Sequence, residues 1–415
     1  MNLVQLMKSK KSFLLQESKT FCMFPWIHLH SSPQGIAYPC CTSTPSLPIG
    51  NTTENSIKEL INFPEMNSLR LDMLNDVPNS MCTPCYNLEN AGMKSARITS
   101  NEEFGHLFDD EVVNFTNPDG TLSDFKMHYF DIRFNNLCNF KCRTCGSGFS
   151  TQWEAEDLRN NVPYARIIPK NDHQSLVDEV LSHVDNIHLA YFAGGEPLIN
   201  EQHYIILEEF LRRGRTDVHL RYNTNSSNLK YKDKDILSLW SKFKNPIQLY
   251  ASIDHFGKRA EYIRHGTDWG VVEQNLQLLH KQSFIHMSLN TVMSFFNYLT
   301  LKDFYCYLDD KGWYSEKLTT YPMHSPNHIT SMALPEIKKE EGHNNLKELL
   351  KILQNRGYTN TNHYNQLLLL PNWVNAKNDW YKYNELFKSE VQRIDNIRGE
   401  NFCEVFPELA DVLDM

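Results

Sequence analysis

Short apolar runs alternate with longer amphipathic stretches along the middle of the chain. The short runs predict strands at 127–135, 186–193, 218–223, 247–253, 286–292 and 317–321. Helices are predicted near 150–160, 173–184, 201–213, 234–242, 270–282, 300–311 and 335–355. Strands that alternate with helices indicate βαβ units and a parallel sheet. Six such units favour an α/β fold with a partial (β/α)6 TIM-type barrel over a doubly wound sheet.

The segments on either side of this pattern are different. Residues 20–100 are rich in Pro, Ser, Asn and Cys and have only short helical patterns, with one amphipathic stretch at 56–74. A polar connector at 99–124 contains the turn signal Asn-Pro-Asp-Gly. The tail is predicted to be helical over 379–413, with a break at Arg398-Gly399, and to pack against the rest of the chain. We therefore predict three domains: a cysteine-rich module with its connector at 1–124, the barrel at 125–330 and a helical extension at 331–415.

The composition limits which binding partners and which cellular location we expect. The chain has 415 residues, 41% of them hydrophobic, and a net charge of −9. No basic footprint is visible, which argues against a nucleic-acid partner. The sequence has no run of 18 apolar residues, so no transmembrane helix is predicted. The apolar run at 13–15 is too short for a signal-peptide core. We therefore expect a cytoplasmic protein without a membrane partner.

Three cysteines follow the first predicted strand with the spacing C-x3-C-x2-C: Cys138, Cys142 and Cys145. Three thiolates can hold three irons of a four-iron cluster and leave the fourth iron open, whereas a structural zinc site normally has four closed ligands. Active sites of α/β barrels gather at the C-terminal ends of the strands. This loop is therefore expected at the barrel mouth. A zinc knuckle that is completed by a distant His is the alternative.

Polar groups also end the next predicted strands. The second strand ends in Gly194-Gly195-Glu196-Pro197, where two glycines let the backbone approach a ligand and Glu196 can accept from an ammonium group. Thr224-Asn225 ends the third strand and Ser252 the fourth. Arg264 follows 12 residues after Ser252, and Arg is the natural bidentate partner of a carboxylate. Taken singly, these motifs also fit ordinary turns, a core hydroxyl and a surface ion pair.

The cysteine trio and the Gly-Gly-Glu-Pro segment together resemble the radical S-adenosylmethionine superfamily, over roughly residues 125–330. The resemblance implies that Cys138, Cys142 and Cys145 hold a [4Fe-4S] cluster whose open iron binds the amino acid end of S-adenosylmethionine. It also implies a set of cofactor-binding residues: Gly194, Gly195, Glu196, Thr224, Asn225, Ser252 and Arg264. Within this set, the Gly-Gly-Glu-Pro segment binds the amino group, and Ser252 and Arg264 hold the ribose and the carboxylate.

Two positions depart from the family pattern. Thr144 stands where relatives often have an aromatic residue near the adenine, so adenine packing must come from elsewhere. His255 replaces the usual Gly after Ser-x-Asp. A histidine at the mouth is either catalytic or a hydrogen-bonded wall residue.

A second group of cysteines lies before the barrel. Cys22, Gly35 and Cys40 follow the spacing C-x12-G-x4-C, and Cys82 and Cys85 form C-x2-C. The pattern resembles the Twitch domain, the shortened form of the SPASM auxiliary-cluster domain, here in front of the barrel. The resemblance implies that Cys22, Cys40, Cys82 and Cys85 hold an auxiliary [4Fe-4S] cluster. Cys41 can replace Cys40 in this set, and a four-cysteine zinc site has the same ligands.

The resemblance implies a radical S-adenosylmethionine oxidoreductase or mutase. A low-potential donor of the flavodoxin or ferredoxin type would supply one electron, S-adenosylmethionine would be cleaved to a 5′-deoxyadenosyl radical, and the radical would abstract hydrogen from the substrate. Fold and cofactor do not fix the substrate. A sugar or nucleotide-sugar is favoured, because no peptide-recognition domain is evident. The alternatives are a maturase of a peptide or protein, a zinc-stapled binding protein, and a methyl or aminocarboxypropyl transferase.

Overall fold

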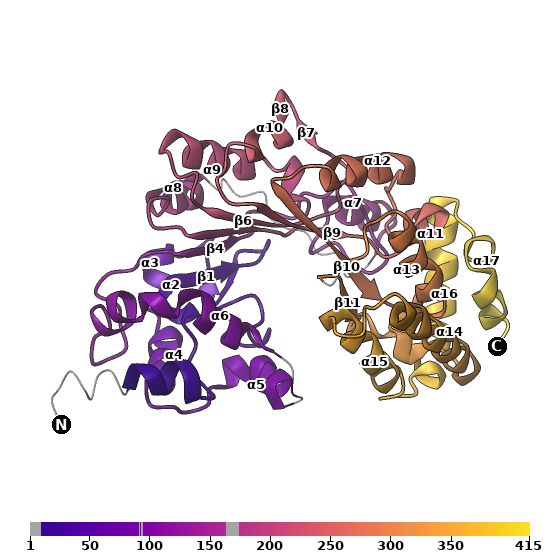
Figure 1. Ribbon diagram of the computed structural model, residues 1–415, viewed down its shortest axis with the longest axis horizontal. Coiled ribbons are helices and arrows are strands. Elements are labelled where there is room, and N and C mark those ends of the chain that lie inside the picture. Colours follow the sequence, from indigo (N-terminus) through magenta and orange to yellow (C-terminus); the bar gives the residue numbers. More distant parts are fainter. Residues whose placement is uncertain (1–9, 91, 93, 163–173, 316) are drawn as a thin grey trace. The chain divides into compact units, whose positions relative to one another are not determined.

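The computed structural model describes residues 10–90, 92, 94–162, 174–315 and 317–415, and the chain divides into two compact units (Figure 1). The first unit comprises Met1–Asn136, Ile167–Arg221 and Ser238–Asn245, and the second comprises Leu137–Arg166, Tyr222–Leu237 and Pro246–Met415. The start of the predicted helix at 173–184 and the first nine residues lie outside the described residues.

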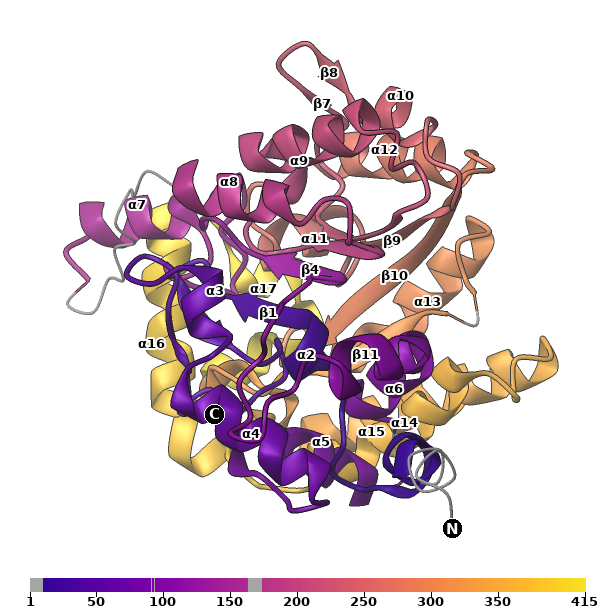
Figure 2. The same cartoon turned by 90° about the vertical axis from the view of Figure 1, so that its left-hand side faces the viewer.

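The first unit is built on a sheet with the strand order β6-β5-β4-β1-β2-β3. Its strands are β1 (His28–Ser31), β2 (Ile36–Tyr38), β3 (Gly50–Asn51), β4 (Tyr129–Ile132), β5 (Leu189–Phe192) and β6 (His219–Thr224), which continues into the second unit. β4 is parallel to β1, beside which it lies in Figure 2, and to β5. β2 is antiparallel to β1 and β3. The α-helices are α2 (Phe24–Ile27), α3 (Ile57–Leu60), α4 (Pro64–Leu74), α5 (Thr83–Asn90), α6 (Ala96–Phe104), α8 (Gln174–Ser182) and α9 (Glu201–Arg212).

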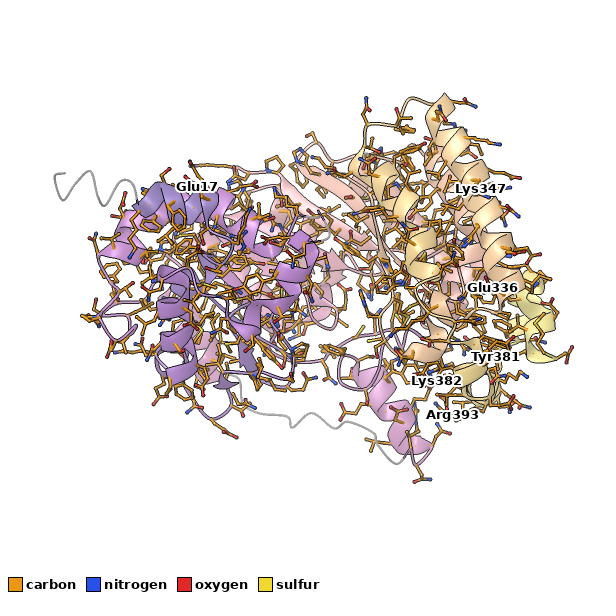
Figure 3. The ribbon with its side chains drawn as sticks, turned by 90° about the horizontal axis from the view of Figure 1, so that it is seen from below. Glu17, Glu336, Lys347, Tyr381, Lys382 and Arg393 are labelled. Atoms are coloured by element: carbon orange, nitrogen blue, oxygen red, sulfur yellow. The ribbon has the colours of Figure 1, made fainter. Side chains whose placement is uncertain are left out.

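The second unit contains the parallel strands β9 (Ile247–Ser252), β10 (Ile285–Met293) and β11 (Thr319–Pro322), in the order β11-β10-β9. The short hairpin β7 (Lys230–Tyr231) and β8 (Lys234–Asp235) precedes α10 (Ile236–Trp240), which continues into the first unit. The other α-helices are α7 (Thr151–Arg159), α11 (Gly257–Ile263), α12 (Trp269–His280), α13 (Leu301–Asp310), α14 (Glu336–Asn355), α15 (Asn362–Val374), α16 (Trp380–Arg398) and α17 (Phe402–Val405). Charged side chains project from α14 and α16, among them Lys347 and Lys382 (Figure 3).

The fold class is the predicted one. Each predicted strand matches an observed strand of the α/β fold, and helices follow β4, β5, β6, β9, β10 and β11 as in the six units of a partial barrel. The helical tail is also confirmed, and its predicted break lies at Gly399, whose φ of +66° ends α16 in a left-handed cap. The prediction of short helical patterns alone in the N-terminal segment was incomplete, because β1, β2 and β3 lie there too.

Buried groups in the first unit fix its cysteine-rich part. The guanidinium of Arg70 is fully buried in α4 and donates to the carbonyls of Pro25, Ile61 and Gly120 at 2.9, 2.5 and 3.0 Å. Because buried carbonyls need donors, these hydrogen bonds from one side chain connect three separate segments of the chain. Desolvation lowers its pKa to about 9.

Among the described helices, none has the length and apolar character needed to cross a bilayer.

Candidate functional site

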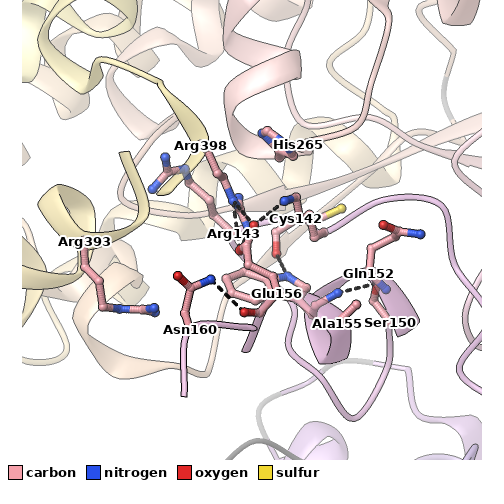
Figure 4. Close-up of polar contacts among 12 residues, drawn as sticks. Cys142, Arg143, Ser150, Gln152, Ala155, Glu156, Asn160, His265, Arg393 and Arg398 are labelled. Atoms are coloured by element: carbon pink, nitrogen blue, oxygen red, sulfur yellow. Dashed lines mark hydrogen bonds and ion pairs between the residues drawn. The ribbon is translucent and has the colours of Figure 1, made fainter. Parts of the chain in front are cut away.

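The loop that joins β4 to α7 carries the three predicted barrel cysteines, Cys138, Cys142 and Cys145, in its part that belongs to the second unit. The loop is irregular, but hydrogen bonds hold it. The Lys141 N–H donates to the His265 carbonyl at 2.9 Å, and the indole N–H of Trp153 in α7 donates to the Cys142 carbonyl at 2.7 Å (Figure 4). All three cysteines are partly exposed. The loop thus presents three thiols on a fixed backbone.

Burial keeps these thiols in their neutral form when no metal is bound. Burial raises the pKa of Cys142 to about 12, and the positive charge of Arg264 is the main opposing influence. Burial also raises the pKa of Cys145, against the same Arg264 charge. The Phe140 N–H donates to the Cys138 sulfur at 3.4 Å. Thiols with raised pKa stay protonated until a metal or cluster binds them, and binding then releases the protons.

A small pocket in the second unit is lined by three predicted cofactor residues, Asn225, Ser252 and Arg264. Phe140, Asp254 and Trp269 also line it. Arg264 Nε lies 2.8 Å from Asp254 Oδ2, and the Asp254 side chain is fully buried. The fourth predicted residue of this group, Thr224, is buried, and its hydroxyl accepts from the Ser226 N–H at 3.0 Å. Thr224 therefore shapes the turn after β6.

His255 is a wall residue of the second unit. Its Nδ1 accepts from the Phe256 N–H at 3.0 Å, and its Nε2 lies 3.1 Å from the Thr300 hydroxyl. Both ring nitrogens therefore have partners, and the imidazole is buried. Desolvation lowers its pKa to about 3. A neutral ring held in this way fits the second of the two predicted roles, the hydrogen-bonded wall residue.

The Gly-Gly-Glu-Pro segment lies in the first unit, directly after β5. Gly194 has a φ of +117°, and a Cβ at this position would lie 3.3 Å from the Cβ of Arg133. Glu196 is almost fully buried, and its carboxylate accepts from the Leu198 N–H at 3.0 Å. A small pocket is lined by Arg133, Asn135, Gly195, Glu196, Asn200 and neighbouring residues. The segment thus borders a pocket that has both a cation and an acid in its wall.

Four predicted cluster ligands lie in the first unit: Cys22, Cys40, Cys82 and Cys85. Burial raises the pKa of Cys22 and of Cys40 to about 12 and that of Cys82 further. The Thr42 hydroxyl lies 3.3 Å from the Cys40 sulfur and 3.8 Å from the Cys85 sulfur. Gly35, at φ +77°, lies in the turn between β1 and β2.

Cys41 has different neighbours. It is exposed, and the charges that act on it include those of Asp131 and Arg133, both near the end of β4. Asp131 is fully buried; its two oxygens lie 2.9 Å from His30 Nδ1 and 3.3 Å from Arg133 Nε. The opposite charge of Arg133 and the contact with His30 outweigh burial and lower the pKa of Asp131. Sequence reasoning missed His30 as a partner of Asp131, because only the pairing of β1 with β4 places the two residues opposite each other.

The predicted site residues therefore form three groups, each within one unit. The second unit holds the barrel cysteines together with Thr224, Asn225, Ser252 and Arg264; the first unit holds Gly194 to Glu196 and the four N-terminal cysteines. Within the part of the chain that the structure describes, no three His, Cys, Asp or Glu side chains converge as they would around one metal ion.

Two family models match the chain. Residues 132–309 match the radical SAM superfamily, where SAM is S-adenosylmethionine, and residues 22–87 match SPASM, an iron-sulfur cluster-binding domain. No curated protein is a significant match.

Several solved structures are similar to the chain. Native anSMEcpe with bound AdoMet is 18% identical, with a TM-score of 0.36 over 54% of this chain and 60% of that one. SuiB of Streptococcus suis bound to S-adenosylmethionine is 13% identical, with a TM-score of 0.38 over 71% of this chain and 64% of that one. TYW1 with a lysine-pyruvate adduct is 13% identical, with a TM-score of 0.31 over 55% of this chain and 71% of that one. The chain thus spans about 60% of the length of the first of these structures.

Proposed function

We propose, from the premise that this chain belongs to the radical S-adenosylmethionine superfamily and carries an N-terminal SPASM iron–sulfur domain, that it cleaves S-adenosylmethionine to activate a small metabolite. It is an enzyme whose cofactors are a [4Fe-4S] cluster, S-adenosylmethionine and an auxiliary iron–sulfur cluster. When bound, the first cluster supplies the electron that cleaves S-adenosylmethionine to methionine and a 5′-deoxyadenosyl radical, which abstracts hydrogen from the substrate.

The roles of individual residues belong to this proposal. Cys138, Cys142 and Cys145 hold the first cluster, and their closely spaced positions on a hydrogen-bonded loop support this role. The shared pocket of Asn225, Ser252 and Arg264 supports a role in holding the cofactor, and this is the observation that carries the proposal. Thr224 shapes the turn beside them. Asp254 pairs with the Arg264 guanidinium, so the position of this positive charge is set before a ligand arrives.

Gly194, Gly195 and Glu196 take the amino group of S-adenosylmethionine. The pocket beside them supports this role, because Glu196 and Arg133 place an acid and a cation in its wall. A zwitterionic amino acid group needs both. Gly194 has a positive φ and no side chain, so the aliphatic part of the Arg133 side chain can lie against the turn.

Cys22, Cys40, Cys82 and Cys85 hold the auxiliary cluster, with Cys40 rather than Cys41 as the ligand. The Thr42 hydroxyl, which contacts the sulfurs of both Cys40 and Cys85, supports this set. We also propose the domain limits 1–124, 125–330 and 331–415, with the auxiliary module first and the helical extension last.

The proposed substrate is a sugar or nucleotide-sugar. On β9, the partly exposed Gln248, Tyr250 and Ser252 alternate with buried apolar residues, so one strand face offers hydrogen-bonding groups. Such a face suits a hydroxyl-rich molecule. The reaction needs a reductant as well as a substrate, and we propose a donor of the flavodoxin or ferredoxin type and a cytoplasmic location.

Anaerobic reconstitution tests the proposal. The protein should bind about eight irons per chain, in two four-iron clusters, and should release 5′-deoxyadenosine from S-adenosylmethionine after reduction with dithionite. Abundant zinc without iron and sulfide would instead support the binding-protein alternative. Methylthioadenosine as the product would support the transferase alternative.

The substrate class is tested with a metabolite extract of the host, separated into a small-molecule fraction and a peptide fraction. We expect 5′-deoxyadenosine formation to rise with the small-molecule fraction. Stimulation by the peptide fraction alone would identify a peptide maturase and overturn the proposed substrate.

A further inference from the structure

The C-terminal segment of the second unit reaches the cysteine loop through buried ion pairs (Figure 4). Arg143 follows Cys142 directly in the sequence, and its side chain is only 2% exposed. Its Nη2 lies 2.5 Å from Asp395 Oδ1 in α16 and 2.5 Å from Glu400 Oε2 beyond the end of that helix. The guanidinium also lies over the ring of Tyr262, 3.7 Å from its centroid.

A second ion pair joins α16 to the helix that follows the loop. Arg398 is fully buried and binds Glu156 in α7, with Nη2 2.8 Å and Nε 3.1 Å from Oε1. Its guanidinium lies 4.5 Å from the Trp153 ring. Trp153 is the residue that donates to the Cys142 carbonyl, and Glu156 also pairs with Lys141. The two ion pairs thus reach both ends of the short stretch from Lys141 to Arg143.

The carboxylates of Asp395 and Glu400 make further hydrogen bonds besides those with Arg143. Asp395 also accepts from the Tyr262 hydroxyl at 2.8 Å and from the Phe402 N–H at 2.7 Å, and Glu400 contacts His265 at 2.5 Å. Buried ion pairs cost desolvation energy and are stable only when further hydrogen bonds satisfy both partners. A tail that needed only packing would not require so many buried charges beside one loop.

We propose that the tail from Asp395 to Glu400 belongs to the cluster site, with Asp395, Arg398 and Glu400 as positioning residues. They hold the loop of Cys138, Cys142 and Cys145 in its cluster-accepting shape, and the two carboxylates balance the Arg143 charge beside Cys142. The inference rests on the proposed role of these cysteines. It adds that the last part of the chain sets the reduction potential of the first cluster, because nearby charges shift cluster potentials.

The test is a redox titration of the reconstituted two-cluster protein, followed by electron paramagnetic resonance with S-adenosylmethionine present. Only the first cluster has an open iron, so only its signal should change when S-adenosylmethionine is added. We expect Asp395→Asn and Glu400→Gln to raise the midpoint potential of that cluster, because each removes a negative charge with little change of shape. Arg143→Met should lower it. The auxiliary signal should stay unchanged in all three variants.

Lys388→Gln is the matched control, because it also removes a charge from α16 but its partner Glu385 is exposed. It should leave both potentials unchanged. Shifts of the same sign for acidic and basic substitutions, or no shifts, would overturn the proposal, since a merely structural role predicts no dependence on charge. If Arg143→Met loses the cluster, the two isosteric acid variants decide the result.

The outcome is separable from that of the proposed function. A wild-type protein that binds both clusters but forms no 5′-deoxyadenosine would refute the function and still permit the titration. A wild-type protein that binds no iron at the barrel cysteines would overturn both.

Discussion

At the scale of single residues, buried histidines make the fold sensitive to acid. His363 in α15 is fully buried, with Nδ1 2.9 Å from the Tyr314 hydroxyl and Nε2 2.9 Å from the Thr320 hydroxyl. Burial lowers its pKa from 6.5 to about 3. Between these values the unfolded chain binds more protons than the folded one, so stability is lost as the pH falls below about 6.5. The loss is about 1.4 kcal/mol per pH unit for one such group.

The measurement is the thermal midpoint under anaerobic conditions at pH 7.5 and at about pH 5.5, within the window set by the lowered pKa. We expect His363→Gln to be less stable than the wild type at pH 7.5, but to lose less stability on acidification. His219→Gln, at an exposed position of β6, is the control and should follow the wild type. An equal loss in the wild type and in His363→Gln would contradict the prediction.

Gly194 is a residue at which a single methyl group should disturb the proposed cofactor site. Its φ of +117° is strained for any residue with a side chain, and an added Cβ would lie 3.3 Å from Arg133. Such strain costs roughly 1–3 kcal/mol. We expect Gly194→Ala to weaken S-adenosylmethionine binding about tenfold or more, since each 1.4 kcal/mol is a factor of ten. Equilibrium binding to the anaerobic protein measures this.

The control for this substitution is Gly270→Ala. Gly270 lies in α12, and the nearest atom to an added Cβ would be Asp268 Oδ1 at 3.4 Å, an ordinary contact distance. Its binding constant should match that of the wild type. Unchanged affinity in Gly194→Ala would show that the turn does not contact the cofactor.

At the scale of elements, β2 and the turn after it decide which of two adjacent cysteines is a ligand. The Thr42 hydroxyl contacts the sulfurs of both Cys40 and Cys85, whereas Cys41 is exposed. We expect Cys40→Ala to lose about four of the eight irons and Cys41→Ala to keep them all. Iron and sulfide analysis after anaerobic reconstitution measures both. The reverse pattern would assign the cluster to Cys41.

The strands of the barrel were predictable from sequence, because apolar runs of strand length alternate with amphipathic stretches. β1 was not predictable in this way. Its residues, from His28 to Ser31, are polar at three of four positions and yet all buried. Only parallel pairing with β4, about 100 residues later, makes it a strand, and that pairing brings His30 to Asp131. A contact of such long range leaves no local pattern.

The cysteine groups show the same difference between what local sequence predicts and what long-range contacts decide. Fixed spacing along the chain identified both groups of cysteines, because ligands from one loop must lie close in sequence. Spacing does not distinguish Cys40 from Cys41, because the two residues are adjacent in the sequence, and Cys40 stays the proposed ligand. The ion pairs of Arg143 with Asp395 and Glu400 join residues more than 250 positions apart. The tail was expected to pack, but its link to the cysteine loop needed the structure.

At the scale of the whole molecule, the two cysteine groups lie in different units and should fail independently. Cys142→Ala removes a proposed ligand of the first cluster, so S-adenosylmethionine cleavage should be abolished while about four irons remain in the auxiliary module. Cys82→Ala should keep some cleavage without substrate turnover, because the auxiliary cluster has no open iron and its expected part is electron transfer. Cys306→Ala, in α13, is the control and should retain both clusters and full cleavage. Full turnover by Cys82→Ala would refute a role of the auxiliary cluster in the reaction, whereas loss of all iron in either variant would show that the two sites depend on each other.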